Sequence, residues 1–231
     1  MIYRYIVDFF LPNRCPLCDR LIKWNELVCK ECEKKINNVT DEITNRNLPE
    51  ELYFERAFSV AYYENEVKDT IYRMKEGECR NFSEYCAVRL AQKLKENGVV
   101  DKIDIITAVP MSFRKKIKRG CSHAEIFAGF MKIHLKKKTC FDLLKVKDDR
   151  SFQHHLSAVQ RKSHADKLYY ANEKHIDIRG KTVLLCDDVL TTGSTLNACA
   201  EILKEKCGAD KVYCAVCAKT KFENNSEKSE E

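Results

Sequence analysis

The residues best suited to chemistry lie together in one stretch, VLLCDDVLTTGSTL, residues 183–196. Its apolar start predicts a buried strand that delivers two adjacent carboxylates, Asp187 and Asp188, to its carboxyl end. A hydroxyl-rich loop then opens a helix, and the N–H groups at a helix N-terminus bind phosphate. The loop residues are Thr191, Thr192, Gly193, Ser194 and Thr195.

This stretch predicts a site for a phosphorylated sugar. Gly193 lets the backbone approach an anion closely, and the loop hydroxyls add donors. The two acids can hold ribose hydroxyls directly or through Mg²⁺, and they divide these tasks because successive strand residues face opposite ways. The alternative is an acidic strand end followed by a well-capped helix. The loop is not a Walker A motif, because the G-x-x-x-x-G-K-[ST] pattern is absent.

A second chemical motif is the cysteine quartet Cys15-x₂-Cys18-x₁₀-Cys29-x₂-Cys32. Each pair places two thiolates on one turn, and two pairs complete a tetrahedron, so we expect a structural Zn²⁺. A redox pair or an iron–sulfur cluster is the alternative. Four protein ligands leave no open position on the metal, so we assign no catalysis to it. A segment this small needs metal merely to fold.

The remaining cysteines are interpreted as structural. Cys214 and Cys217 repeat the C-x-x-C spacing, but within a strand residues three apart point to opposite faces, which predicts core packing. Seven others have no ligand spacing and are expected to fill small apolar spaces: Cys79, Cys86, Cys121, Cys140, Cys186, Cys199 and Cys207. The total of thirteen is odd, which favours reduced thiols and a cytoplasmic setting.

Alternating strand and helix patterns predict the elements that position these motifs. Strands are expected at 57–63, 103–109, 140–146, 181–186 and 212–218, and helices at 67–75, 83–96, 122–135 and 195–206. This alternation predicts an α/β fold with a mainly parallel sheet. Ligands bind beyond the carboxyl ends of such strands, so we expect the site among the loops after Val109, Val146 and Cys186.

Composition agrees with a folded protein of this class. The chain has 231 residues, 44% of them hydrophobic and 33% charged, which excludes a disordered chain. Only 7 glycines and 4 prolines argue against turn-dense all-β folds. We expect an N-terminal helix and zinc module at 1–36, a linker at 37–52, the main domain at 53–220 and a disordered tail at 221–231. No transmembrane span is expected, because the apolar run from Tyr5 to Leu11 is short and contains Asp8.

The acidic and hydroxyl-rich stretch resembles the 5-phosphoribosyl-1-diphosphate (PRPP) signature of type I phosphoribosyltransferases. That resemblance implies that the two acids contact the ribose hydroxyls, that the loop of residues 191–195 holds the 5′-phosphate, and that Mg²⁺ accompanies PRPP. It implies a phosphoribosyltransferase, although the sequence names no acceptor base.

The combination of a Cys₄ module with this signature resembles the ComF family of competence-associated proteins nearly end to end. The matching residues are Pro12, Tyr63, Ile71, Lys75, Val109, Pro110, Arg119, Gly120, Ala124, Arg150, Gln153, Leu156, Ser157 and Arg161. The chain departs from the family at Cys121-Ser122-His123, where Phe-Asn-Gln is usual, and at His164, where an Asn is common.

Basic residues near the expected site are candidates for diphosphate contacts. Arg114, Lys115 and Arg119 belong to a basic stretch after the strand that ends at Val109, and positive charge is needed where a diphosphate leaves. Lys75 and Arg150 are candidates through the resemblance alone. The alternative for the basic stretch is a solvated surface or a nucleic-acid contact.

Two functions therefore compete. One is phosphoribosyl transfer from PRPP. The other, implied by the resemblance, is a non-enzymatic adaptor for single-stranded DNA in natural transformation, working with helicase and other competence proteins. Phe113, Phe152, Tyr169 and Tyr170 are candidates for a base-stacking surface. Two carboxylates suit ribose hydroxyls and would repel a DNA backbone, so the acids favour the PRPP interpretation.

Overall fold

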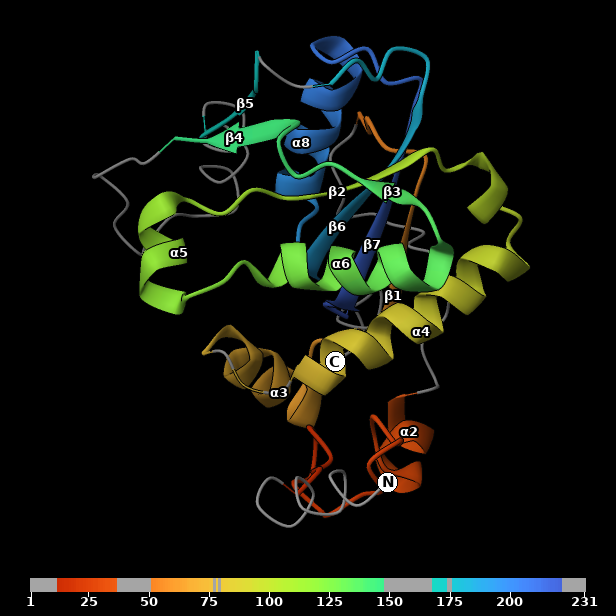
Figure 1. The fold of residues 1–231 in the computed structure, drawn as a ribbon, viewed down its shortest axis with the longest axis vertical. Helices are drawn as coiled ribbons and strands as arrows, with labels where there is room; N and C mark the ends of the chain where they lie inside the picture. Colours follow the sequence, from red (N-terminus) through yellow and green to blue (C-terminus); the bar gives the residue numbers. More distant parts are fainter. Residues whose placement is uncertain are drawn as a thin grey trace, which may run out of the picture.

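The computed structural model describes residues 12–36, 51–76, 78, 80–147, 168–173 and 176–221. Its centre is a five-stranded sheet in the order β1-β7-β6-β2-β3, and every pairing in it is parallel (Figure 1). The strands are β1 Arg56–Tyr62, β2 Ile105–Ala108, β3 Lys138–Thr139, β6 Thr182–Leu190 and β7 Lys211–Lys219. The expected α/β fold with a mainly parallel sheet is confirmed.

Helices cover both faces of this sheet, because its inner strands are apolar on both sides. Helices α3, α4 and α6 contribute to a core on one face, and α8 covers the other (Figure 1). Their bounds are α3 Asn65–Lys75, α4 Arg80–Glu96, α6 His123–Leu135 and α8 Ser194–Glu205, with a short 3₁₀ turn η1 at Val100–Lys102. Each of the four predicted helices is present, within a few residues of its expected ends.

Strand alternation distributes the core cysteines between the two faces. Cys217 is buried in the core beneath α4 and α6, where Cys86 contacts it, whereas Cys214 is buried in the core beneath α8. Burial first, together with neighbouring groups, raises the pKa of the Cys214 thiol well above its ordinary value. The interpretation of this C-x-x-C pair as core is confirmed.

The prediction of a strand at 140–146 in the main sheet is wrong. Only β4, Leu144–Val146, is a strand, and it pairs antiparallel with β5, Tyr169–Ala171, in a separate two-stranded sheet. The edge position beside β2 is occupied by β3, which comes earlier in the chain. Helix α6 ends at Leu135, the C-cap residue Lys136 adopts a left-handed conformation, and the chain pairs with β2 from Lys138 onward. Leu143 and Leu144 are buried instead in the core beneath α8.

Two further differences bear on the site. Strand β6 continues four residues beyond the predicted end at Cys186, because β7 is long enough to pair with it as far as Leu190. The basic stretch expected as a loop forms helix α5, Phe113–Arg119. Ser112 caps that helix by accepting from the Lys115 N–H, and Gly120 ends it at φ 76°.

The cysteine module packs directly onto the α/β domain. Its short helix α2, Lys30–Ile36, lies close to α3 and α4 (Figure 1), and its buried cysteines belong to the same core as those helices. The Pro16 carbonyl accepts from the Thr70 hydroxyl at 2.8 Å and from the Arg73 guanidinium. The turn between Cys15 and Cys18 is therefore hydrogen-bonded to the side of α3.

The expected domain boundaries stay predictions, since most of the proposed linker and tail, residues 37–50 and 222–231, lies outside the described residues. Among the helices that are described, none combines the length and apolar character needed to cross a bilayer.

Candidate functional site

Asp187 and Asp188 lie near the carboxyl end of β6 and point to opposite faces of the strand. Asp188 Oδ2 lies 3.0 Å from Lys75 Nζ, and the two side chains are 20% and 24% exposed. Asp187 turns back on the chain, where its Oδ1 accepts from the Asp188 N–H at 2.8 Å. The two adjacent acids therefore have different partners, as strand alternation predicts.

The charge state of Asp187 depends on its burial and on its neighbours. Burial first, and the Asp188 charge second, raise the pKa of Asp187 well above its ordinary value, although the Asp188 N–H and Lys75 oppose this. A divalent cation would relieve both effects, and carboxylate oxygens are the ligands that Mg²⁺ prefers. The donor set at Asp187 and Asp188 thus fits Mg²⁺ held together with an oxygen-rich ligand.

The loop that follows β6 opens helix α8 without a side-chain cap. Gly193 is the N-cap residue and adopts φ 74°, a left-handed conformation that glycine reaches without strain. The first turn of α8 carries no acidic residue. Thr192 Oγ1 and Ser194 Oγ lie 3.0 Å apart and add hydroxyls beside the first N–H groups. This combination suits a phosphate group.

A pocket of about 220 Å³ lies beside the acids. It brings together the segments expected at the site: the chain after β2, the end of β4, and the two carboxylates. Lys115 and Arg119 line it from α5. One wall is basic and another acidic, which suits a ligand carrying both hydroxyl groups and a diphosphate.

The predicted site residues divide into three groups. Lys115 and Arg119 line the pocket, and Lys75 reaches Asp188 from the end of α3. Arg114 lies on α5 but is not among the lining residues. Arg150 falls outside the described residues.

Two further pocket residues carry signals that the sequence did not assign to ligand binding. His123, the first residue of α6, is 3% exposed, and burial lowers its pKa below the ordinary value. Tyr169 comes from β5, and burial, as the largest cause, raises the pKa of its phenol above the ordinary value. Tyr169 was expected only as a stacking surface. No local pattern links either residue to the acids, because the fold joins segments far apart in sequence.

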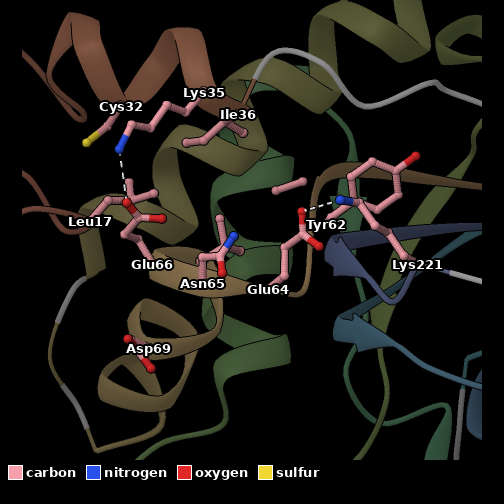
Figure 2. A pocket seen from close by; sticks show the side chains of 12 residues that line it. Leu17, Cys32, Lys35, Ile36, Tyr62, Glu64, Asn65, Glu66, Asp69 and Lys221 are labelled. Atoms are coloured by element: carbon pink, nitrogen blue, oxygen red, sulfur yellow. Dashed lines mark hydrogen bonds and ion pairs between the residues drawn. The ribbon is translucent and has the colours of Figure 1, made fainter.

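A larger groove of about 960 Å³ lies elsewhere, between the cysteine module and the start of α3. Figure 2 shows four of its charged side chains in two ion pairs, with Asp69 apart from them. Lys35 Nζ lies 3.0 Å from Glu66, and Lys221 Nζ lies 2.6 Å from Glu64. These pairs neutralise four of the groove's charged groups, whereas the smaller pocket holds the predicted acids and cations, so the candidate site is the smaller pocket at Asp187 and Asp188.

The cysteine quartet forms a second candidate centre. The four sulfur atoms of Cys15, Cys18, Cys29 and Cys32 lie within 4.8 Å of one another, and Cys18 Sγ is 3.7 Å from Cys29 Sγ. Zn–S bonds of about 2.3 Å in a tetrahedron place sulfurs about 3.8 Å apart, so the quartet fits zinc. Burial works against ionisation of the Cys15 thiol, but backbone N–H groups outweigh it and lower its pKa to about 7. The module supports a structural zinc site.

Comparison with known proteins gives two family matches. Residues 117–231 match the phosphoribosyl transferase domain, and residues 6–45 match the double zinc ribbon domain. No curated protein matches the chain. The first match spans α6, the acid pair, the loop of residues 191–195 and α8, and it agrees with a fold of the type I phosphoribosyltransferase kind.

Among solved structures, a purine phosphoribosyltransferase from Pyrococcus horikoshii Ot3 is 23% identical over 62% of this chain and 79% of its own, with a TM-score of 0.40. A hypothetical protein from Neisseria gonorrhoeae with bound ppGpp is 21% identical over 62% and 73%, with a TM-score of 0.38. A hypoxanthine phosphoribosyltransferase from Staphylococcus aureus is 13% identical over 63% and 71%, with a TM-score of 0.36.

Proposed function

We propose that this zinc-ribbon protein with a phosphoribosyltransferase-like domain binds PRPP with Mg²⁺ and transfers its phosphoribosyl group to an acceptor. The observation that carries the proposal is a set of three features around the carboxyl end of β6, of which the first and the third line one pocket. These are the acid pair on β6, the uncapped N-terminus of α8, and the cationic wall formed by Lys115 and Arg119. Each matches one part of PRPP: the ribose hydroxyls, the 5′-phosphate and the diphosphate.

The roles of the residues follow from their charges. The N–H groups and hydroxyls of residues 191–195 hold the 5′-phosphate, which sets the position of the ribose ring. Asp187 and Asp188 orient the ribose hydroxyls, and their negative charge favours the positive charge that develops at C1 as the diphosphate leaves. Arg119 and Lys115 stabilise the departing diphosphate. Bound Mg²⁺ would neutralise further diphosphate charge.

Lys75 regulates the charge of the acid pair before a ligand arrives. Its Nζ neutralises Asp188, while the pKa of Asp187 stays raised. Mg²⁺ bound with PRPP would place a further positive charge beside Asp187, so that both acids are ionised in the complex. Binding is therefore expected to release a proton from the acid pair when it starts from a pH at which Asp187 is protonated.

Single-stranded nucleic acid is a second candidate ligand, and helix α5 favours it. Phe113 and Ile117 are each 68% exposed, and they lie on the side of the helix opposite Lys115 and Arg119. Arg114 and Lys118 flank them. An aromatic side chain among cations is suited to an unstacked base and its backbone. This surface supports a role of the ComF type in the cytoplasmic handling of incoming DNA, with helicase partners.

The test of the main proposal is calorimetric titration with PRPP and Mg²⁺. We expect micromolar binding by the wild type and none by Asp187→Asn/Asp188→Asn, while Asp210→Asn, which changes an exposed acid away from the site, binds normally. Absence of binding by zinc-loaded wild type would overturn the PRPP proposal. A parallel titration with single-stranded DNA at rising salt concentrations tests the second candidate, for which Phe113→Ala is the informative variant.

A further inference from the structure

Cys121 and His123 form a thiol–imidazole pair at the start of helix α6. Cys121 Sγ lies 4.0 Å from His123 Nε2 and 3.9 Å from the carbonyl oxygen of Arg119, both within hydrogen-bond distance for sulfur. The thiol is free and half-buried, so solvent reaches it. The sequence pattern assigned this cysteine to apolar packing, but both of these contacts are polar. The proposed PRPP chemistry uses neither side chain.

The imidazole can take the proton of the thiol, whereas the carbonyl oxygen cannot. His123 is 3% exposed, and burial lowers its pKa, which favours the neutral ring. A neutral imidazole has one nitrogen that accepts a proton. With the ring proton on Nδ1, Nε2 is that nitrogen, and it faces Cys121 Sγ. A thiol beside such a base becomes a nucleophilic thiolate.

The chain on either side of Cys121 favours negative charge on the sulfur. The thiol lies just before the N-terminus of α6, a helix of 13 residues, and the dipole of that helix stabilises an anion there. Helix α5 ends just before Cys121 with Lys118 and Arg119. The acid in the first turn of α6, Glu125, is paired with Lys116 at 2.9 Å. These features stabilise a thiolate and attract an anionic reagent.

We propose that Cys121 is a modification site that takes an anionic low-molecular-weight disulfide by thiol–disulfide exchange, with His123 as the proton acceptor. The Cys121 thiolate attacks one sulfur of the reagent. A bond forms between Cys121 Sγ and that sulfur as the S–S bond of the reagent breaks. The other half leaves as a thiolate and takes the proton from His123. Cys121 is thereby oxidised to a mixed disulfide, and the reagent is reduced to one thiol.

The adduct has a consequence for the neighbouring pocket. Arg119 and His123 line that pocket, and Cys121 lies between them in the sequence. A negatively charged group on Cys121 therefore competes with a diphosphate for the Arg119 guanidinium. This consequence rests on the proposed PRPP function, whereas the modification itself does not.

The chain contains a matched control thiol. Cys140 is also free and half-buried, but among the described residues Cys121 is the cysteine whose sulfur lies within hydrogen-bond distance of a histidine ring. The zinc-loaded protein is treated with hydroxyethyl disulfide, which is neutral, oxidised glutathione, which is anionic, or cystamine, which is cationic. Peptide mapping by mass spectrometry then gives the rate of mixed-disulfide formation at each cysteine.

The neutral reagent tests the role of the histidine. We expect Cys121 to react about tenfold faster than Cys140, and His123→Gln to remove that excess without changing the rate at Cys140. Equal rates at the two cysteines of the wild type, or an excess that survives His123→Gln, overturn the proposal. If His123→Gln does not fold, which reaction of the buried Cys186 would reveal, His123→Asn decides by the same ratio.

The charged reagents test the choice of an anion. Cys121 should react at least about tenfold faster with oxidised glutathione than with cystamine. Arg119→Gln should reduce this preference at Cys121 and leave the preference at Cys140 unchanged. Equal rates with the two charged reagents, or a faster reaction with cystamine, overturn the assignment of an anionic disulfide.

Calorimetry tests the consequence for the ligand. Protein carrying glutathione on Cys121 should bind PRPP·Mg²⁺ about tenfold more weakly, and dithiothreitol should restore the binding. Cys121→Ser treated in the same way should bind like untreated protein. Undiminished binding by the modified wild type overturns the consequence. If untreated wild type binds no PRPP, the proposed function fails, but the rates at Cys121 and Cys140 still decide whether the modification site exists.

Discussion

We expect neutralising Asp187 and neutralising Asp188 to have opposite effects on the free energy of unfolding. Asp187→Asn removes a carboxyl whose ionisation is opposed by burial and by Asp188. Asp188→Asn instead removes the partner of Lys75, at 3.0 Å. We expect the first substitution to stabilise the folded protein and the second to destabilise it, while both abolish Mg²⁺-dependent PRPP binding.

The magnitude for Asp188 follows from the geometry of the pair. At an effective dielectric constant of about 20, two unit charges 3.0 Å apart attract by about 5–6 kcal/mol. Desolvation offsets most of this attraction, and asparagine retains an oxygen acceptor, so the net loss should be about 1–2 kcal/mol. Removing the disfavoured carboxyl at Asp187 should raise the free energy of unfolding by about 1–2 kcal/mol at neutral pH.

The pH dependence of the Asp187 effect has a definite sign. The pKa of this group is raised in the folded state, so its contribution to stability is present below the unfolded value and is lost as pH rises through the folded value. The gain from Asp187→Asn should therefore be small below about pH 4 and grow toward neutral pH. Asparagine at 187 has no such titration.

Urea unfolding followed by circular dichroism at several pH values measures both effects. Asp210→Asn provides the control, since this exposed acid lies at the opposite end of the sheet, next to the start of β7. A shift of the same sign in both site variants at pH 8, or a gain in Asp187→Asn that does not vary with pH, would refute this account of the acid pair.

Three other substitutions test separate parts of the molecule. Cys29→Ser should remove the bound zinc and lower the free energy of unfolding by at least about 3 kcal/mol, measured by metal analysis and thermal melting, because zinc binding and folding of the module are coupled. Gly193→Ala should destabilise by about 1–2 kcal/mol, seen as a lower melting temperature, because this residue adopts φ 74°; an unchanged melting temperature would contradict the conformation described. Arg119→Ala should weaken PRPP binding about tenfold or more in calorimetry, whereas Arg114→Ala, outside the pocket, should change it by less than about twofold.

The elements that surround the acids could be predicted because their signals are local. The apolar run at 181–186 predicts β6, and the helical spacing of apolar residues at 195–206 predicts α8. Parallel βα connections place the intervening loop at the ligand edge. The helix predicted at 122–135 also forms for a local reason, because the Ser122 side chain caps α6 by accepting from the Glu125 N–H. Cys214 and Cys217 are another case, because strand geometry alone assigns them to opposite faces.

The differences arise where distant segments decide the outcome. The end of β6 at Leu190 depends on the length of β7, and the fate of residues 140–146 depends on β3 taking the sheet edge first. Helix α5 was missed because its seven residues have no apolar face toward the core. His123 lines the pocket only because the fold packs α6 against β6, and no spacing along the chain records that packing.

Helix α3 is hydrogen-bonded to the turn between Cys15 and Cys18, and it forms an ion pair with Asp188 in the wall of the pocket. The Pro16 carbonyl, between two zinc-binding cysteines, accepts from Thr70 and Arg73, and two residues later Lys75 reaches Asp188. We therefore expect metal occupancy of the quartet and ligand binding at the acids to be linked through this helix, and such linkage is reciprocal. Ligand bound at the acids should slow the loss of zinc to a chelator, and loss of zinc should weaken binding at the acids. On this expectation, zinc strengthens ligand binding at the acids as well as stabilising the folded module.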